Sequence, residues 1–121
     1  MSKYKAQGFA GTFRNARKGF RLVVRSEMNI RIHLVITFFV LLGAHWLKFS
    51  ALEFCALLFA IAIVIISEML NTAIEFTLDS IYHNRYSKMV GMAKDISAGA
   101  VMFASFISLL VGIILFGKHL L

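Results

Sequence analysis

Long apolar stretches alternate along the chain with short segments that carry its charges. The longest, residues 96–117, contains no Asp, Glu, Lys or Arg, and a helix of about 20 such residues crosses a bilayer. A second crossing is predicted over about residues 51–81, which are apolar in their first half and polar in their second. A third is predicted over about residues 32–49, where Arg31 and Lys48 at the two ends can extend their side chains toward the interfaces.

The segment ahead of these crossings has a different pattern. Over residues 9–26, Phe9, Phe13, Phe20 and Val24 recur near helical spacing, while Arg and Lys residues occupy other positions. A basic amphipathic pattern of this kind predicts a helix that lies in the membrane interface and does not cross the bilayer.

The composition also favours a membrane protein. Hydrophobic residues make up 60% of the chain, proline is absent and the mean hydropathy is +0.80, which is outside the usual range of soluble domains. We therefore predict an all-α membrane protein with one domain, residues 1–121, built from three transmembrane helices and an N-terminal amphipathic surface helix. No cleavable signal peptide is expected, because charges occur throughout the first 30 residues.

The basic residues are unevenly distributed. Of 13 Lys and Arg residues, eight lie in residues 1–31 and three in residues 82–95, and the formal net charge is +7. By the positive-inside rule, the N-terminus and the 82–95 segment should face the cytoplasm. A basic start suits an anionic membrane surface, and the apolar remainder argues against a nucleic acid partner.

Polar residues gather in the second half of the 51–81 crossing. A period of 3.6 residues brings five of them to roughly one helix face: Glu68, Asn71, Thr72, Glu75 and Asp79. An ionised carboxylate near the bilayer centre costs roughly 2.5–3.5 kcal/mol on the insertion scale. This acidic stripe therefore predicts a functional site or an ion pathway, with a paired structural role as the alternative.

Five of the six acids can converge near the cytoplasmic interface, because Glu27 and Asp95 join the three of the stripe. Carboxylates without a surplus of His or Cys favour Mg²⁺, which usually takes one or two carboxylates together with nucleotide phosphates. Lys94 offers a cation for phosphate, and Asn71 offers a hydrogen-bonding group. These groups are typical of phosphoryl transfer, although the chain contains no GxxxxGK[ST] or GxGxxG motif.

Each of these residues also has a plainer interpretation. Glu27 alone suits a solvated helix end, and Lys94 alone suits a positive-inside anchor. A channel or proton-coupled transporter would use the acidic stripe as its ion path, but it would not need Glu27 or Lys94 with Asp95. The histidines lack a second His at i+3 or i+4 and are expected at the interface (His33, His45) or in solvent (His83, His119).

Two runs of sequence carry a resemblance to a known family. EMLNTAIEFTLD at 68–79 and AKDISAGAV at 93–101 closely resemble the signature of the prokaryotic integral-membrane diacylglycerol kinases and undecaprenol kinases. Earlier pieces look like that family in the same order: Lys18-Gly19 with Arg21, then Glu27, then RIHL at 31–34.

This resemblance implies a homotrimer in the bacterial cytoplasmic (inner) membrane, with active sites at the cytoplasmic interface that use residues of more than one subunit. ATP would be the co-substrate and Mg²⁺ the cofactor. Glu68 corresponds to the catalytic base that takes the proton of the lipid hydroxyl. Glu27 and Glu75 correspond to the carboxylates that hold the Mg²⁺ bound to ATP.

The remaining assignments also come from the resemblance. Nucleotide contacts are expected from residues on several segments: Asn15, Glu27, Asn71, Glu75, Tyr86, Lys94 and Asp95. The lipid substrate is expected to meet Glu68 and Ala98, and Asp79 is expected to support the site.

The substrate prediction depends on two positions. His33 and Thr72 look more like the Gram-positive branch of the family, which prefers undecaprenol, than the enterobacterial branch, which prefers diacylglycerol. The sequence therefore predicts an ATP-dependent lipid kinase that phosphorylates the primary hydroxyl of undecaprenol, with a diacylglycerol kinase that makes phosphatidic acid as the alternative.

Overall fold

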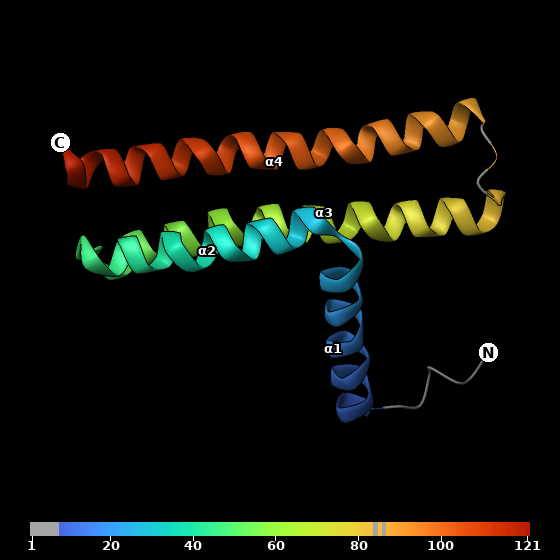
Figure 1. Cartoon of the computed structure of the whole chain (residues 1–121), viewed down its shortest axis with the longest axis horizontal. Coiled ribbons are helices and arrows are strands. Elements are labelled where there is room, and N and C mark those ends of the chain that lie inside the picture. Colours follow the sequence, from blue (N-terminus) through green and yellow to red (C-terminus); the bar gives the residue numbers. More distant parts are fainter. Residues whose placement is uncertain (1–7, 84, 86) are drawn as a thin grey trace.

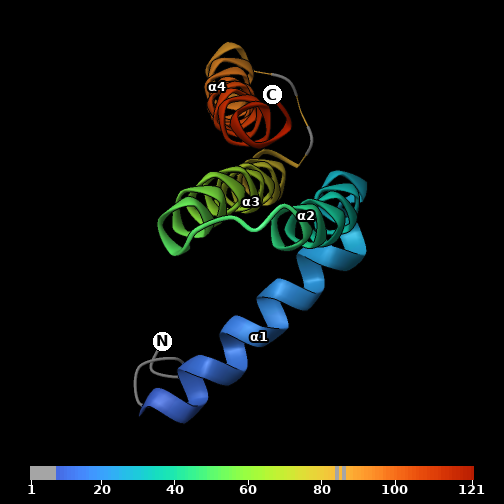
Figure 2. The same cartoon turned by 90° about the vertical axis from the view of Figure 1, so that its left-hand side faces the viewer.

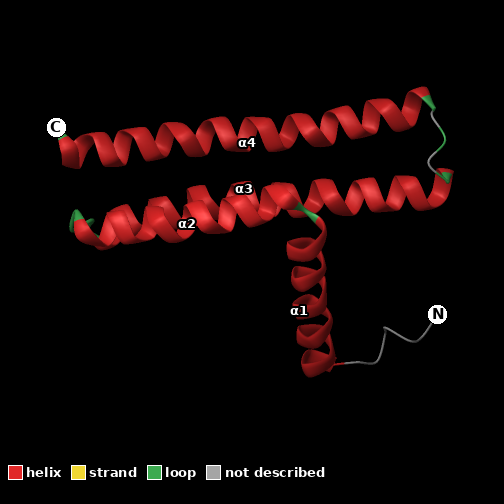
Figure 3. Cartoon of the chain, in the orientation of Figure 1, coloured by secondary structure: helices red, strands yellow, loops and turns green. Residues whose placement is uncertain are grey.

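The computed structural model describes residues 8–83, 85 and 87–121, and these residues form four helices and no strand. The helices are α1 (Gly8–Ser26), α2 (Met28–Trp46), α3 (Ala51–Tyr82) and α4 (Lys88–Leu120), coloured in Figure 3 by their secondary structure. The prediction of an all-α protein is confirmed. The helix α2 begins and ends a few residues before the predicted 32–49 crossing. It ends ahead of Lys48, which takes a left-handed conformation (φ 62°) in the turn to α3.

Three of the helices run side by side, and one runs crosswise to them. Figure 1 shows α3 and α4 antiparallel along their whole length, with α2 beside the first half of α3. Figure 2 shows α2 and α3 side by side with α4 above them, and α1 leads away from the start of α2. The second half of α3 and the first part of α4 therefore extend past the junction of α1 and α2.

The helices α2, α3 and α4 are each long and apolar enough to cross a membrane. The 32 residues of α3 correspond to about 48 Å of helix, whereas the hydrocarbon core of a bilayer is about 30 Å thick. A straight α3 therefore cannot lie entirely inside the hydrocarbon. Its first half is apolar and its second half carries the acidic stripe, so the second half is the part expected to emerge.

The corner between α1 and α2 is built around an arginine. Arg31 donates hydrogen bonds through Nη1 to the carbonyl oxygens of Val24 and Arg25, both at 2.8 Å, and so satisfies carbonyls that the end of α1 leaves without helical partners. Glu27, the residue at the corner, has an extended backbone (φ −115°, ψ 114°). This geometry turns α1 crosswise and leaves Glu27 half-buried at the corner. That α1 lies on the membrane surface stays a prediction.

The compact core of the bundle lies at the opposite end, near the turn between α2 and α3. Ala44 has no exposed surface, and Phe49 and Leu57 are buried beside it. The neighbouring Gly43 faces the ring of Phe116, where an added Cβ would lie 3.4 Å from a ring carbon. Small residues at this point therefore let α2 approach the end of α4 closely.

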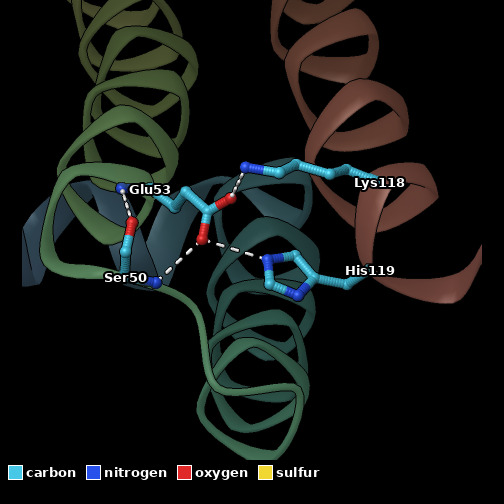
Figure 4. Close-up of polar contacts among 4 residues, drawn as sticks. All are labelled: Ser50, Glu53, Lys118 and His119. Atoms are coloured by element: carbon cyan, nitrogen blue, oxygen red, sulfur yellow. Dashed lines mark hydrogen bonds and ion pairs between the residues drawn. The ribbon is translucent and has the colours of Figure 1, made fainter.

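A polar cluster, which we call the C-terminal clasp, closes this end of the bundle (Figure 4). Ser50 caps α3 by accepting from the backbone N–H of Glu53, while the Glu53 carboxylate accepts from the N–H of Ser50 at 2.8 Å. The same carboxylate lies 2.9 Å from Lys118 Nζ and 3.0 Å from His119 Nε2. The His119 ring also stacks on Phe49, with centroids 4.6 Å apart. The expectation that His119 faces solvent is therefore wrong, because two neighbours cover its ring.

Replacing Ser50 by alanine should lower the free energy of unfolding by about 1 kcal/mol, the usual cost of a lost helix cap. Glu53→Gln should lower the unfolding temperature further, because it also weakens the contacts with Lys118 and His119. Thermal unfolding in detergent, followed by circular dichroism, measures both changes. Ser80→Ala, at an exposed position of α3, is the control. Equal unfolding temperatures for all four proteins would contradict a stabilising role of the clasp.

Much of the apolar surface of the single chain is uncovered. Large side chains such as Phe59 (78% exposed) and Phe103 (69% exposed) point away from the chain, and almost none of the spanning part of α4 is buried. An apolar surface of this extent requires lipid or other protein around it.

Candidate functional site

Glu68 is the buried acid of the polar half of α3, with 5% of its surface exposed. At about 1.5 Å per residue, it lies about 26 Å along the helix from Ala51, close to the thickness of the hydrocarbon core. His33 of α2 approaches it, with 3.7 Å between Nε2 and Glu68 Oε1, which is an ion-pair distance when the imidazole is protonated. The sequence placed His33 only at the interface, and the packing of α2 on α3 brings it to the candidate base.

Two further carboxylates act electrostatically on Glu68: those of Glu27, from the corner between α1 and α2, and of Glu75, two turns along α3. Both are half-buried. Three like charges from two segments of the chain repel one another unless cations or protons accompany them. The structure thus places two of the acids selected from the sequence, Glu27 and Glu75, within electrostatic reach of a third, Glu68.

A chain of hydrogen bonds connects Glu75 to α4. The hydroxyl of Ser97 donates to Asn71 Oδ1 at 2.6 Å, and Asn71 Nδ2 donates to Glu75 Oε1 at 3.4 Å. Thr72, the buried neighbour of Asn71, donates its hydroxyl to the backbone oxygen of Glu68 at 3.0 Å. These bonds hold Asn71 and Glu75 of the acidic stripe on the side of α3 that meets α4.

Asp79 and Lys94 form an ion pair across α3 and α4, with 2.8 Å between Oδ1 and Nζ. Beside them is a hollow of about 340 Å³ at the end of the helices, lined by Leu78, Asp79, Arg85, Val90, Gly91, Lys94 and Asp95. Sequence reasoning used Arg85 only for membrane orientation and missed it as part of this hollow. The sequence feature that could have identified Arg85 is its position in the short connection between two predicted helices.

An apolar groove of about 420 Å³ includes His33, whose ring lies 3.7 Å from Glu68, in its lining. It is lined by residues of α2, α3 and α4, from His33 through Val40 and Ile61 to Phe116 at the other end of the bundle. Ser105, Ser108 and Gly112 on α4 are small residues that leave space there. The groove can hold an apolar chain with its polar end near Glu68.

Among the residues that the structure describes, the site offers two carboxylates that suit Mg²⁺ but not a complete set of metal ligands. Glu27 and Glu75 supply only oxygen atoms, and Mg²⁺ usually binds one or two carboxylates and completes its shell with phosphates and water. Within residues 8–83, 85 and 87–121 of one chain, no group of three His, Cys, Asp or Glu side chains could hold a metal. The two carboxylates could therefore serve a metal that arrives with a nucleotide, but the chain offers no closed metal cage in its described part.

Three of the other predicted residues are exposed on α1 or α4. Asn15 is exposed on α1, and Asp95 is exposed on α4 beside the Lys94 hollow. Ala98 is exposed on α4 and lines neither of the two hollows described above. Tyr86 lies outside the described residues.

A sequence profile of the family described as prokaryotic diacylglycerol kinase matches residues 14–116. The chain is 33% identical over 101 residues to a diacylglycerol kinase of Synechocystis, and 32% identical over 108 residues to an undecaprenol kinase of Bacillus subtilis. It is 31% identical over 102 residues to a diacylglycerol kinase of Escherichia coli. These matches cover 84%, 89% and 84% of the chain, and 58%, 87% and 83% of the respective relatives. The chain thus spans less than two thirds of the Synechocystis protein and most of the other two.

Proposed function

The chain belongs to the prokaryotic diacylglycerol kinase family, a family of membrane lipid kinases, and from that premise we propose that it transfers the γ-phosphoryl group of ATP to the primary hydroxyl of a membrane lipid alcohol. The observation that carries the proposal is the position of Glu68, which is buried, begins the polar half of α3 and lies 3.7 Å from His33 of the apolar groove. A lipid alcohol can reach Glu68 from the groove, and a nucleotide can reach it from the polar side.

In this proposal, Glu68 is the general base. The lipid oxygen forms a bond to the γ-phosphorus, its proton passes to the Glu68 carboxylate, and the bond from the γ-phosphorus to the β–γ bridging oxygen breaks to release ADP. The apolar groove supports this role because His33, one of its lining residues, lies 3.7 Å from Glu68, so that a lipid bound there would carry its hydroxyl toward this carboxylate. The bundle around Glu68 excludes bulk water, which would limit transfer of phosphate to water.

Glu27 and Glu75 would hold the Mg²⁺ of MgATP, and the bound ion neutralises charge on the β- and γ-phosphates. Asn71 orients Glu75, and Asp79 holds Lys94 beside the hollow at the end of α3 and α4. Arg85 and Lys94 give this hollow two cations for phosphate oxygens, and Asp95 lines it too, which supports the nucleotide contacts proposed for Lys94 and Asp95. The nucleotide contacts proposed for Asn15 and Tyr86 rest on the family resemblance.

We further propose a homotrimer in the bacterial inner membrane, with the N-terminus and the sites on the cytoplasmic side. The exposed apolar faces of α2, α3 and α4 support an assembly. The basic residues of segments 1–31 and 82–95 support the orientation. Sites shared between subunits would add donors to the two carboxylates that one chain provides, and α1, lying on the surface, would cover them.

The preference for undecaprenol rests on His33 and Thr72. Both residues contact Glu68: His33 through its ring at 3.7 Å and Thr72 through its hydroxyl bond to the Glu68 carbonyl. The two positions that suggest the substrate therefore adjoin the proposed base. The relatives include kinases named for either lipid at similar identity, so identity alone does not separate the two substrates.

Purified protein in lipid nanodiscs with MgATP should phosphorylate undecaprenol faster than diacylglycerol at equal lipid concentration. Radiolabelled phosphate recovered in the lipid fraction measures both rates, and a reaction without added lipid alcohol sets the background. Faster labelling of diacylglycerol would overturn the substrate preference alone. If neither lipid were labelled and the protein conducted ions across liposome membranes, the kinase proposal would be overturned in favour of a channel.

A further inference from the structure

Ser97 connects α4 to the acidic stripe although neither the sequence motifs nor the proposed mechanism gives it a role. It is buried, with 8% of its surface exposed, and lies in the third turn of α4. Its hydroxyl donates to Asn71 Oδ1 at 2.6 Å, which is a short hydrogen bond between two helices. A buried hydroxyl that contacts the amide next to a proposed metal ligand is in a position to influence that ligand.

We propose that Ser97 is a positioning residue that fixes the Asn71 side-chain amide so that its nitrogen faces Glu75. The proposal rests on the proposed function, in which Glu75 holds the magnesium nucleotide. It assigns Ser97 no contact with the substrate or the reacting atoms. Ser97 acts through Asn71, and Asn71 acts on the Glu75 carboxylate.

The chemistry of the three groups permits one orientation of the amide. An ionised carboxylate only accepts hydrogen bonds, so the Asn71 nitrogen must face Glu75, and the Asn71 oxygen is then left to find a donor. The Ser97 hydroxyl is that donor. If the amide turned by 180°, its oxygen would face the Glu75 carboxylate, and two acceptors would oppose each other.

The bond from Asn71 to Glu75 depends on this support. At 3.4 Å between Nδ2 and Oε1 it is longer than the usual 2.7–3.2 Å, so it restrains Glu75 only weakly unless the amide is held from its other side. Outer partners that orient a metal ligand are typically worth about 10–100-fold in metal affinity. Alanine is smaller than serine by one oxygen and is a strong helix former, so Ser97→Ala should remove the hydroxyl without disturbing α4.

Binding of Mn²⁺, used as a paramagnetic substitute for Mg²⁺, separates positioning from stability. Electron paramagnetic resonance in nanodiscs, with a non-hydrolysable ATP analogue, measures the affinity without turnover. Ser97→Ala should weaken Mn²⁺ binding about tenfold, the low end of the effect of an outer partner, at a temperature where the variant remains folded. Ser97→Thr keeps the hydroxyl and should retain most of the affinity. Ser80→Ala, an exposed serine of α3, should bind Mn²⁺ like the wild type.

A double-mutant cycle tests whether Ser97 acts through Asn71. Asn71→Ala should weaken Mn²⁺ binding, and adding Ser97→Ala to it should weaken binding no further. Additive losses, or wild-type affinity in Ser97→Ala while the wild type binds Mn²⁺ with nucleotide, would overturn the positioning role and leave the kinase proposal intact. A wild type that binds no Mn²⁺ with nucleotide would overturn both. A Ser97→Ala loss in a protein that phosphorylates no lipid would support the positioning role and overturn the kinase.

Discussion

Glu68→Gln is expected to reduce the rate of lipid phosphorylation about 10²–10⁴-fold, the usual contribution of a general base. Glutamine has nearly the shape of glutamate and still accepts a hydrogen bond from a lipid hydroxyl, but it cannot take up the proton. The lipid should therefore bind, and the chemical step should be slow. Turnover at saturating MgATP and lipid, measured in nanodiscs, reports this loss as a lower kcat with a smaller change in KM.

Glu53→Gln is the matched control for this result, because it makes the same chemical change on the same helix, in the C-terminal clasp far from Glu68. Below its own unfolding temperature, Glu53→Gln should keep wild-type turnover. Both variants should elute with the wild type in size-exclusion chromatography. Glu68→Gln with near wild-type turnover would remove Glu68 as the base, whereas an equal loss in both variants would indicate a structural effect.

The helices could be predicted from the sequence because their signals are local. The uncharged stretches and the basic amphipathic start indicate how many helices there are and how long they are. The structure has three helices that can span a membrane, preceded by α1. The corner between α1 and α2 could not be predicted in this way. It depends on Arg31 returning to the carbonyls of Val24 and Arg25, and no periodic pattern encodes a side chain that caps the preceding helix.

The acidic stripe was predictable as a set, whereas its partners were not. Periodicity places residues on one face of α3, but the rotation of α4 against that face decides that Asp79 meets Lys94 and Asn71 meets Ser97. The short connection after Tyr82 makes α3 and α4 antiparallel. A residue nearer the start of α3 therefore meets a residue nearer the end of α4. The pair of Glu53 with Lys118 continues this order at the other end.

His119 illustrates a different failure of prediction. A histidine near the end of a chain, without a second His nearby, suggested a solvent-facing residue, yet its ring lies on Phe49 and contacts Glu53. The sequence held a signal for this contact, because a glutamate three residues after a serine is a capping box and fixes where its carboxylate lies. No local sequence pattern indicates that α4 ends beside this cap.

Glu75→Gln is expected to weaken the binding of Mn²⁺ with nucleotide and to lower turnover by about a hundredfold or more, as when a charge-stabilising group is removed from an active site. Glutamine can still accept the hydrogen bond from Asn71, so the change removes mainly the negative charge. Raising the Mg²⁺ concentration should recover part of the activity, because the lost group is a metal ligand and not the base. Turnover as a function of Mg²⁺ concentration, together with Mn²⁺ binding, measures both effects.

Asp79→Asn gives the contrast that makes this prediction specific. Asp79 lies one turn beyond Glu75 but contacts Lys94 at 2.8 Å, so its loss should release the lysine and change the KM for ATP more than the affinity for Mn²⁺. The larger loss of Mn²⁺ affinity in Glu75→Gln would then distinguish Glu75 from a neighbouring acid on the same helix face. If Glu75→Gln and Asp79→Asn weakened Mn²⁺ binding equally, the effect would come from the summed negative charge of the stripe. Glu75 would then lose its assignment as a ligand, and Ser97 and Asn71 would have no metal ligand to position.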